Sequence, residues 1–147
     1  MNTAKVRIGR LLEVRVAAGF RGAADVDALF ASIDRELEAF GSGQQHVTVA
    51  DWRLCPLMSP EAAERFTHHL AHNNARTERS AALAYQDAPV AVLQFMRVIR
   101  EARLPDRKLF FSEDALIRWV NGRLAPAEQR RVRDFLAEGR PPVAPSP

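Results

Sequence analysis

Short apolar runs of strand-like composition alternate along this chain with longer segments of helical periodicity. The runs are Lys5–Ile8, Leu11–Ala17, His46–Trp52, Ser80–Tyr85 and Lys108–Phe111. Only Gly9 and Arg10 separate the first two, which predicts an antiparallel hairpin at one edge of a sheet. The later runs each follow a helical segment, which is typical of parallel strands joined by crossover helices. We therefore predict an α/β fold with a mixed, mainly parallel sheet, in the order β-β-α-β-α-β-α-β-α-α.

Five segments repeat apolar residues every three or four positions, the spacing of one helix face. They are 24–40, 60–76, 89–103, 112–121 and 126–138. Ser59 followed by Pro60 and Glu61 is typical of a helix start, with the serine as N-cap. On the third helix we expect four side chains to be buried, namely Val92, Leu93, Met96 and Ile99.

The length of 147 residues supports one domain, for which we predict the range 1–138. The Pro-rich segment 139–147 is expected to be a flexible tail. Cys55 is the one cysteine, which excludes an internal disulfide and any multi-cysteine metal site. The apolar runs are too short to span a bilayer, and the first residues lack the apolar stretch of a secretory signal. We therefore expect a cytoplasmic location and no bound cofactor.

Positive charge gathers in the second half of the chain. The net charge is +3, yet residues 1–73 hold 8 basic and 9 acidic side chains, whereas residues 74–147 hold 13 basic and 9 acidic ones. This asymmetry favours an acidic partner for the second half. Acidic side chains are interspersed among its arginines, however, and a dense basic stripe with interleaved aromatics is missing. The sequence therefore favours an acidic protein over a nucleic acid as partner.

Three stretches resemble the STAS family, the small bacterial domains that include anti-sigma-factor antagonists and SpoIIAA-like proteins. They are the strand that ends in Asp51 with the helix start at Ser59, the run 79–85 that leads into a helix, and the segment 108–120. The resemblance implies a STAS-like sheet and a non-enzymatic protein–protein interaction domain in bacterial signalling or assembly. It also implies a phosphorylation site at Ser59, although the family's Asp-Ser-x-Gly motif reads Met58-Ser59-Pro60-Glu61 here. A plain N-cap is the competing interpretation.

The predicted partner-binding surface joins the loop after the third strand to the third helix. Its residues are Asp51, Trp52, Leu57, Met58, Ser59, Glu61, Arg97 and Arg100. The expected partner is another protein, and self-association is left open. The alternative is a small-molecule or lipid carrier of the CRAL-TRIO-like type, with an apolar cavity against the sheet.

No set of side chains in the sequence has the pattern of an active site, so we do not expect an enzyme. Glu64, His68 and His72 share one helix face at four-residue spacing, as two imidazoles and a carboxylate on a metal would. A solvated helix face is the more ordinary explanation of that spacing, so no metal site is predicted. Cys55 has no histidine nearby in the sequence to activate it as a nucleophile.

Overall fold

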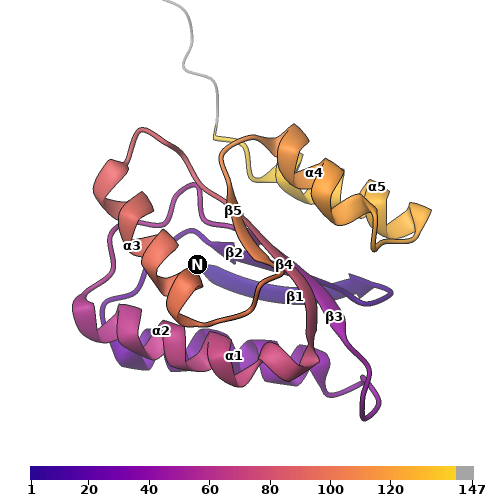
Figure 1. The fold of residues 1–147 in the computed structure, drawn as a ribbon, viewed down its shortest axis with the longest axis horizontal. Coiled ribbons are helices and arrows are strands. Elements are labelled where there is room, and N and C mark those ends of the chain that lie inside the picture. Colours follow the sequence, from indigo (N-terminus) through magenta and orange to yellow (C-terminus); the bar gives the residue numbers. More distant parts are fainter. Residues whose placement is uncertain (142–147) are drawn as a thin grey trace, which may run out of the picture.

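The computed structural model describes residues 1–141, and in them five strands form one sheet between two helical layers (Figure 1). The strands are β1 (Asn2–Ile8), β2 (Leu11–Val16), β3 (His46–Asp51), β4 (Thr77–Leu83) and β5 (Arg107–Phe110). The helices are α1 (Ala23–Leu37), α2 (Pro60–His72), α3 (Pro89–Glu101), α4 (Glu113–Asn121) and α5 (Pro126–Glu138), with a 3₁₀ turn at Asn74–Arg76. The mixed α/β class and the order of elements are those predicted.

The sheet has the order β1-β2-β3-β4-β5, with β1 antiparallel to β2 and the other neighbours parallel. Each crossover moves one strand further in the same direction, and crossovers of one hand then leave their helices on one face. Figure 1 shows α1, α2 and α3 on that face, with α4 and α5 on the other. The strand order never reverses, so the described sheet lacks the switch point at which open α/β sheets usually bind ligands.

Successive side chains of each strand point to opposite faces of the sheet, so the strands contribute to two separate apolar cores. On β3, Val47 and Val49 face α4 and α5, whereas Ala50 and Trp52 belong to the core beneath α1, α2 and α3. A strand covered on both sides needs apolar residues in both sets of positions, which explains the nearly continuous apolar run 46–52.

The second helix is shorter than predicted. It ends at His72 rather than Arg76, and β4 begins at Thr77 rather than Ser80. The backbone N–H of Asn73 still bonds to carbonyls of the last helical turn, and the 3₁₀ turn then leads into the strand. Asparagine and threonine are poor helix formers but good residues for helix ends, which is why the period alone misplaced this boundary.

The prediction for the buried face of α3 is wrong at two positions. Leu93 and Met96 are exposed, at 67% and 50%, while Phe95 is 2% exposed and Val98 is also buried. Apolar residues occupy nearly every side of this helix, so their period does not choose a face. The buried side is the one that packs the large Phe95 ring on Trp52, with centroids 5.1 Å apart.

The last helix, α5, ends at Glu138. Gly139 is the C-cap of that helix, and Arg140 pairs with Glu113, so the first two residues of the expected tail contact the domain. Residues 142–147, the rest of that segment, lie outside the described residues. None of the described helices has the length and apolar character needed to cross a bilayer.

Candidate functional site

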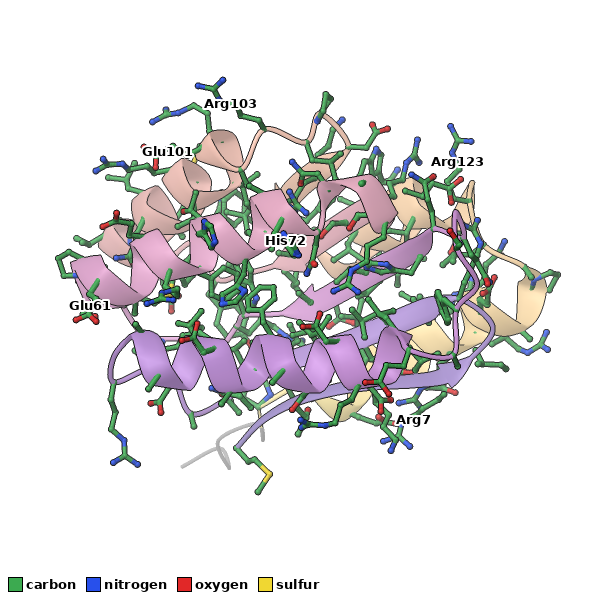
Figure 2. The ribbon with its side chains drawn as sticks, turned by 90° about the horizontal axis from the view of Figure 1, so that it is seen from below. Arg7, Glu61, His72, Glu101, Arg103 and Arg123 are labelled. Atoms are coloured by element: carbon green, nitrogen blue, oxygen red, sulfur yellow. The ribbon has the colours of Figure 1, made fainter. Side chains whose placement is uncertain are left out.

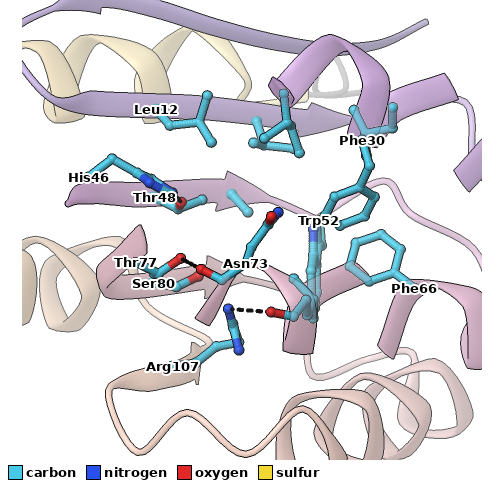
Figure 3. A pocket seen from close by; sticks show the side chains of 15 residues that line it. Leu12, Phe30, His46, Thr48, Trp52, Phe66, Asn73, Thr77, Ser80 and Arg107 are labelled. Carbon is cyan, nitrogen blue, oxygen red and sulfur yellow. Dashed lines mark hydrogen bonds between the residues drawn. The ribbon is translucent and has the colours of Figure 1, made fainter. Parts of the chain in front are cut away.

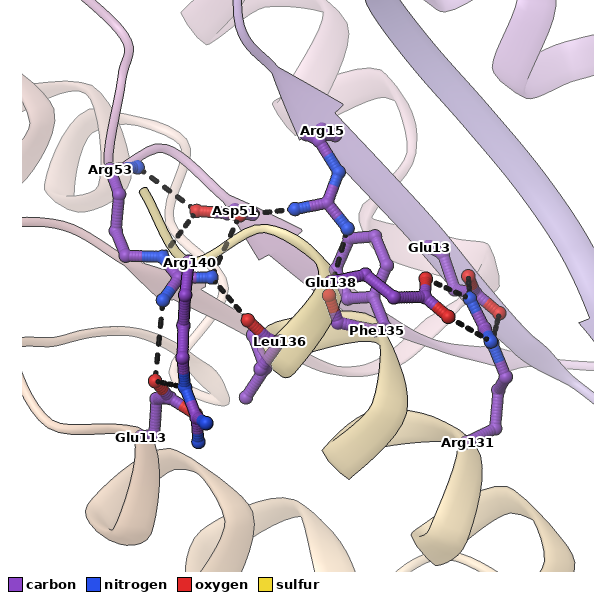
Figure 4. Close-up of polar contacts among 10 residues, drawn as sticks. All are labelled: Glu13, Arg15, Asp51, Arg53, Glu113, Arg131, Phe135, Leu136, Glu138 and Arg140. Atoms are coloured by element: carbon purple, nitrogen blue, oxygen red, sulfur yellow. Dashed lines mark hydrogen bonds and ion pairs between the residues drawn. The ribbon is translucent and has the colours of Figure 1, made fainter. Parts of the chain in front are cut away.

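Asp51, at the carboxyl end of β3, lies in a buried ion network rather than on the surface. It accepts hydrogen bonds from Arg53 Nε and Arg53 Nη2, at 2.9 and 3.0 Å, and one from Arg15 Nη1 at 2.5 Å (Figure 4). Asp51 and Arg53 are both more than nine-tenths buried. Because the two arginines share the charge and the lone pairs of this carboxylate, Asp51 is satisfied without any external group.

The same two arginines hold the last turn of α5 over the carboxyl ends of β2 and β3. Arg15 Nη2 donates to the carbonyl of Phe135, and Arg53 Nη2 donates to that of Leu136, at 2.8 and 2.6 Å. Carbonyls in the last turn of a helix attract cations, so these contacts stabilise the helix end. A Cβ on Gly139 would stand 2.2 Å from an Asp51 carboxylate oxygen, which explains the glycine there. The carboxyl end of β3, where Asp51 was expected to bind a partner, is therefore covered by α5.

Trp52 and Met58 are also buried, so the predicted surface must be corrected at three of its residues, Asp51 being the third. The Trp52 ring lies between Phe66 and Phe95, with centroid separations of 5.6 and 5.1 Å. A tryptophan next to a strand end can lie in the core because a helix covers it, and the sequence pattern carries no signal for that cover. The backbone of Met58 is paired twice with the Gln94 side chain, which draws the loop under α3.

A small cavity lies between the sheet and the layer of α1 and α2. It measures about 40 Å³, with Phe30, Trp52 and Phe66 toward one end and His46, Ser80 and Arg107 toward the other (Figure 3). His46 Nδ1, Trp52 Nε1 and Arg107 Nε have no hydrogen-bond partner among the described residues. That volume accommodates one or two water molecules, the ordinary partners of such atoms. Ligand sites for small molecules are typically about 300–1,000 Å³.

The polar end of this cavity holds two ionisable side chains that burial perturbs. Burial, aided by the nearby Arg76 and Arg107, lowers the pKa of His46 to about 4. Burial also lowers the pKa of Arg107 to about 10. Arg107 donates to the Asn74 side chain at 2.7 Å and, more weakly, to the Leu70 carbonyl in the last turn of α2. These hydrogen bonds therefore hold the C-terminal end of α2 and the turn after it against the start of β5.

Exposed aliphatic side chains gather on α3 and on the loop before α2. We define the α3 surface as the exposed Leu54, Leu57, Val90, Leu93 and Met96, together with the flanking Arg97 and Arg100. The two segments are joined where Gln94 Oε1 accepts from the Met58 backbone N–H and Gln94 Nε2 donates to the Met58 carbonyl, both at 2.8 Å. Contiguous exposed apolar side chains with a polar rim are typical of interaction sites.

Four of the predicted partner-binding residues are exposed, namely Leu57, Glu61, Arg97 and Arg100. Figure 2 shows Glu61 at the start of α2, and Glu101 and Arg103 at the far end of α3. Arg97 pairs with Glu101 one turn later, at 2.9 Å. The contribution that sequence reasoning missed is the exposed apolar stripe of α3, because Leu93 and Met96 were assigned to the core.

Ser59 has the N-cap geometry that its sequence context predicts. It is half-buried, and its hydroxyl accepts a hydrogen bond from the Ala62 backbone N–H at 3.1 Å. This contact satisfies one of the free donors in the first turn of α2 and is worth about 1 kcal/mol in a typical helix. Phosphorylation of Ser59 stays a prediction.

The described residues contain no group of three histidine, cysteine, aspartate or glutamate side chains placed to hold a metal ion. Glu64, His68 and His72 are all exposed, and Figure 2 shows His72 on the outer side of α2. Cys55 is buried, which raises its pKa to about 12. A thiol with that pKa is protonated at neutral pH and is a poor nucleophile.

Several arginines of the second half of the chain form ion pairs within the domain. Arg131 bonds to both oxygens of the buried Glu13 at 2.8 Å and also to Glu138 (Figure 4). These contacts fix α5 to β2. On α3, Arg97 and Arg100 are exposed.

Searches with models of protein families, among curated proteins and among solved structures found no match to this chain. The resemblance to the STAS family therefore stays a prediction.

Proposed function

We propose that this chain is a non-enzymatic protein–protein interaction domain, with the STAS-like sheet order that the sequence resemblance implies, and that it binds its partner through the α3 surface. The observation that carries the proposal is the exposed aliphatic stripe on α3. A helix that turns Leu93 and Met96 to solvent loses the stabilisation that their burial would give, about 1.5–3 kcal/mol for each. Binding a partner recovers it.

The flanking charges favour an acidic partner. Arg97, Arg100 and Arg103 are exposed on or just after α3, with Glu101 as the acidic residue among them. Arginine and methionine, both present on this helix, are enriched in protein interfaces. Rim charges of this kind raise the association rate and the specificity more than the affinity.

The carrier alternative has weaker support. A lipid or metabolite would require a cavity several times larger than the 40 Å³ beneath α2, and the helix layer would have to move to open one. Native mass spectrometry separates the two functions, since a carrier purified from its own cells would retain a small molecule.

The test is affinity capture from a lysate of the source organism, comparing the wild-type chain with Leu93→Ser/Met96→Ser. The matched control is Ile8→Ser, which removes an exposed aliphatic side chain from β1. We expect one protein to be captured in stoichiometric amount by the wild type and by Ile8→Ser, and to be lost with the double variant. Equal capture by all three chains, or none by any, would contradict the proposal.

A further inference from the structure

The two ends of the apolar stripe on α3 carry opposite charges. Asp87 lies just before the helix and Arg100 lies in its last turn, and both side chains are exposed. Leu93, the most exposed apolar side chain of the helix, is six residues after Asp87 and seven before Arg100. Among the described residues, neither Asp87 nor Arg100 is in an ion pair.

This pattern matches its own copy when two α3 helices pack antiparallel. In a two-fold symmetric dimer the same patch meets itself, so a residue near the axis packs on its own counterpart. With the axis next to Leu93, the N-terminal end of one α3 lies over the C-terminal end of the other. Asp87 then faces the Arg100 of the second copy, twice in each dimer. Parallel packing would instead set like charges against each other.

We propose that a second copy of this chain occupies the α3 surface, forming a two-fold dimer in which antiparallel α3 helices pack through Leu93. The inference rests on the proposed interaction surface and names an occupant for it. In this dimer Val90 of one copy lies near Met96 of the other. Leu57, tied to α3 through Met58 and Gln94, widens the contact.

The size of the surface sets the strength of the dimer. Five exposed aliphatic side chains offer an apolar area of roughly a few hundred Å², whereas a stable interface buries roughly 800 Å² on each partner. We therefore expect micromolar affinity, so that a tighter-binding partner can displace the second copy. Exposed ion pairs at the rim are weakened by salt, so the affinity falls as the ionic strength rises.

The free edge of β1 is less suited to a second copy. The backbone N–H of Val6 already donates to the Glu36 carboxylate at 2.8 Å, and Lys5 and Arg7 are exposed along the strand. Charged side chains and a covered donor are devices that block edge-to-edge pairing.

Sedimentation velocity of the full chain from about 5 to 500 µM tests the proposal, since this range brackets a micromolar dissociation constant. We expect the wild type to pass from monomer to dimer, and Leu93→Ser to stay monomeric with an unchanged free energy of unfolding. Asp87→Arg and Arg100→Asp should each weaken the dimer roughly tenfold, because each substitution sets two like-charged pairs together.

The double variant Asp87→Arg/Arg100→Asp exchanges the charges, and it should restore the wild-type dissociation constant. Arg7→Asp, on β1, is the matched control and should leave it unchanged. A wild type that is monomeric up to 500 µM, or a dimer indifferent to both single charge reversals, would overturn the dimer. Neither result would touch the proposed function, which fails if no other protein is captured or if its capture does not depend on Leu93 and Met96.

Discussion

Replacing Phe95 and Leu93 separately by alanine measures which face of α3 belongs to the core. Phe95 is 2% exposed and packs on Trp52, whereas Leu93, two residues earlier, is 67% exposed. A buried phenylalanine removes on the order of 150–200 Å² from water, which at about 25 cal/mol per Å² amounts to roughly 4 kcal/mol. Phe95→Ala should therefore lower the free energy of unfolding by about 3–5 kcal/mol. Leu93→Ala should change it by less than about 0.5 kcal/mol.

Urea denaturation followed by circular dichroism gives both values, at a protein concentration low enough to keep the chain monomeric. A loss of 3–5 kcal/mol is a large part of the stability of a domain, so Phe95→Leu provides a milder variant that should cost about 1 kcal/mol. If Leu93→Ala costs as much as Phe95→Ala, the exposed face is assigned wrongly, and the α3 surface no longer has its apolar stripe.

Three further predictions concern the groups that fix the helices to the sheet. Gly139→Ala should destabilise the domain by about 1–3 kcal/mol in the same assay, because its Cβ would collide with Arg15 and Asp51; an unchanged stability would contradict that close approach. The pKa of His46 is lowered to about 4, so its neutral form contributes fully to the stability of the fold above pH 6.5, and about 3 kcal/mol is lost as the pH falls toward 4. The free energy of unfolding should therefore fall less steeply with decreasing pH in His46→Gln than in the wild type. An identical slope in both would refute the burial of a neutral His46. The hydrogen bond from Arg140 lowers the pKa of Glu113, so Glu113→Gln should reduce the free energy of unfolding at pH 7. This effect should disappear as the pH falls below the ordinary glutamate pKa, and an effect that persists in acid would contradict the ion pair.

The sequence predicted the architecture well because each element carries a local signal. The alternating hairpin, the apolar run of β3 and the capped start of α2 at Ser59 all describe their own segments. The same holds for Pro126 at the start of α5. These signals fix the kind and order of the elements, and the handedness of crossovers then limits the topology.

The candidate site was predicted less well because it depends on contacts between distant segments. From the sequence, Asp51 lies at a strand end where open α/β sheets commonly bind ligands. In the structure, Arg15 and Arg53 bind its carboxylate and α5 covers it. Arg53 gave no sequence signal of burial, since a lone arginine after a strand is usually exposed. The face of α3 could not be chosen because its apolar residues surround the helix, and the core position of Trp52 decides it.

Photo-crosslinking in living cells tests the role of the α3 surface most directly. A photoreactive phenylalanine analogue placed at position 93 touches whatever covers α3, while the same analogue at position 8 reports an exposed aliphatic site on β1. We expect a discrete crosslinked product from position 93, with either another protein or a second copy of the chain, and none from position 8. No product from position 93, or the same products from both positions, would contradict it.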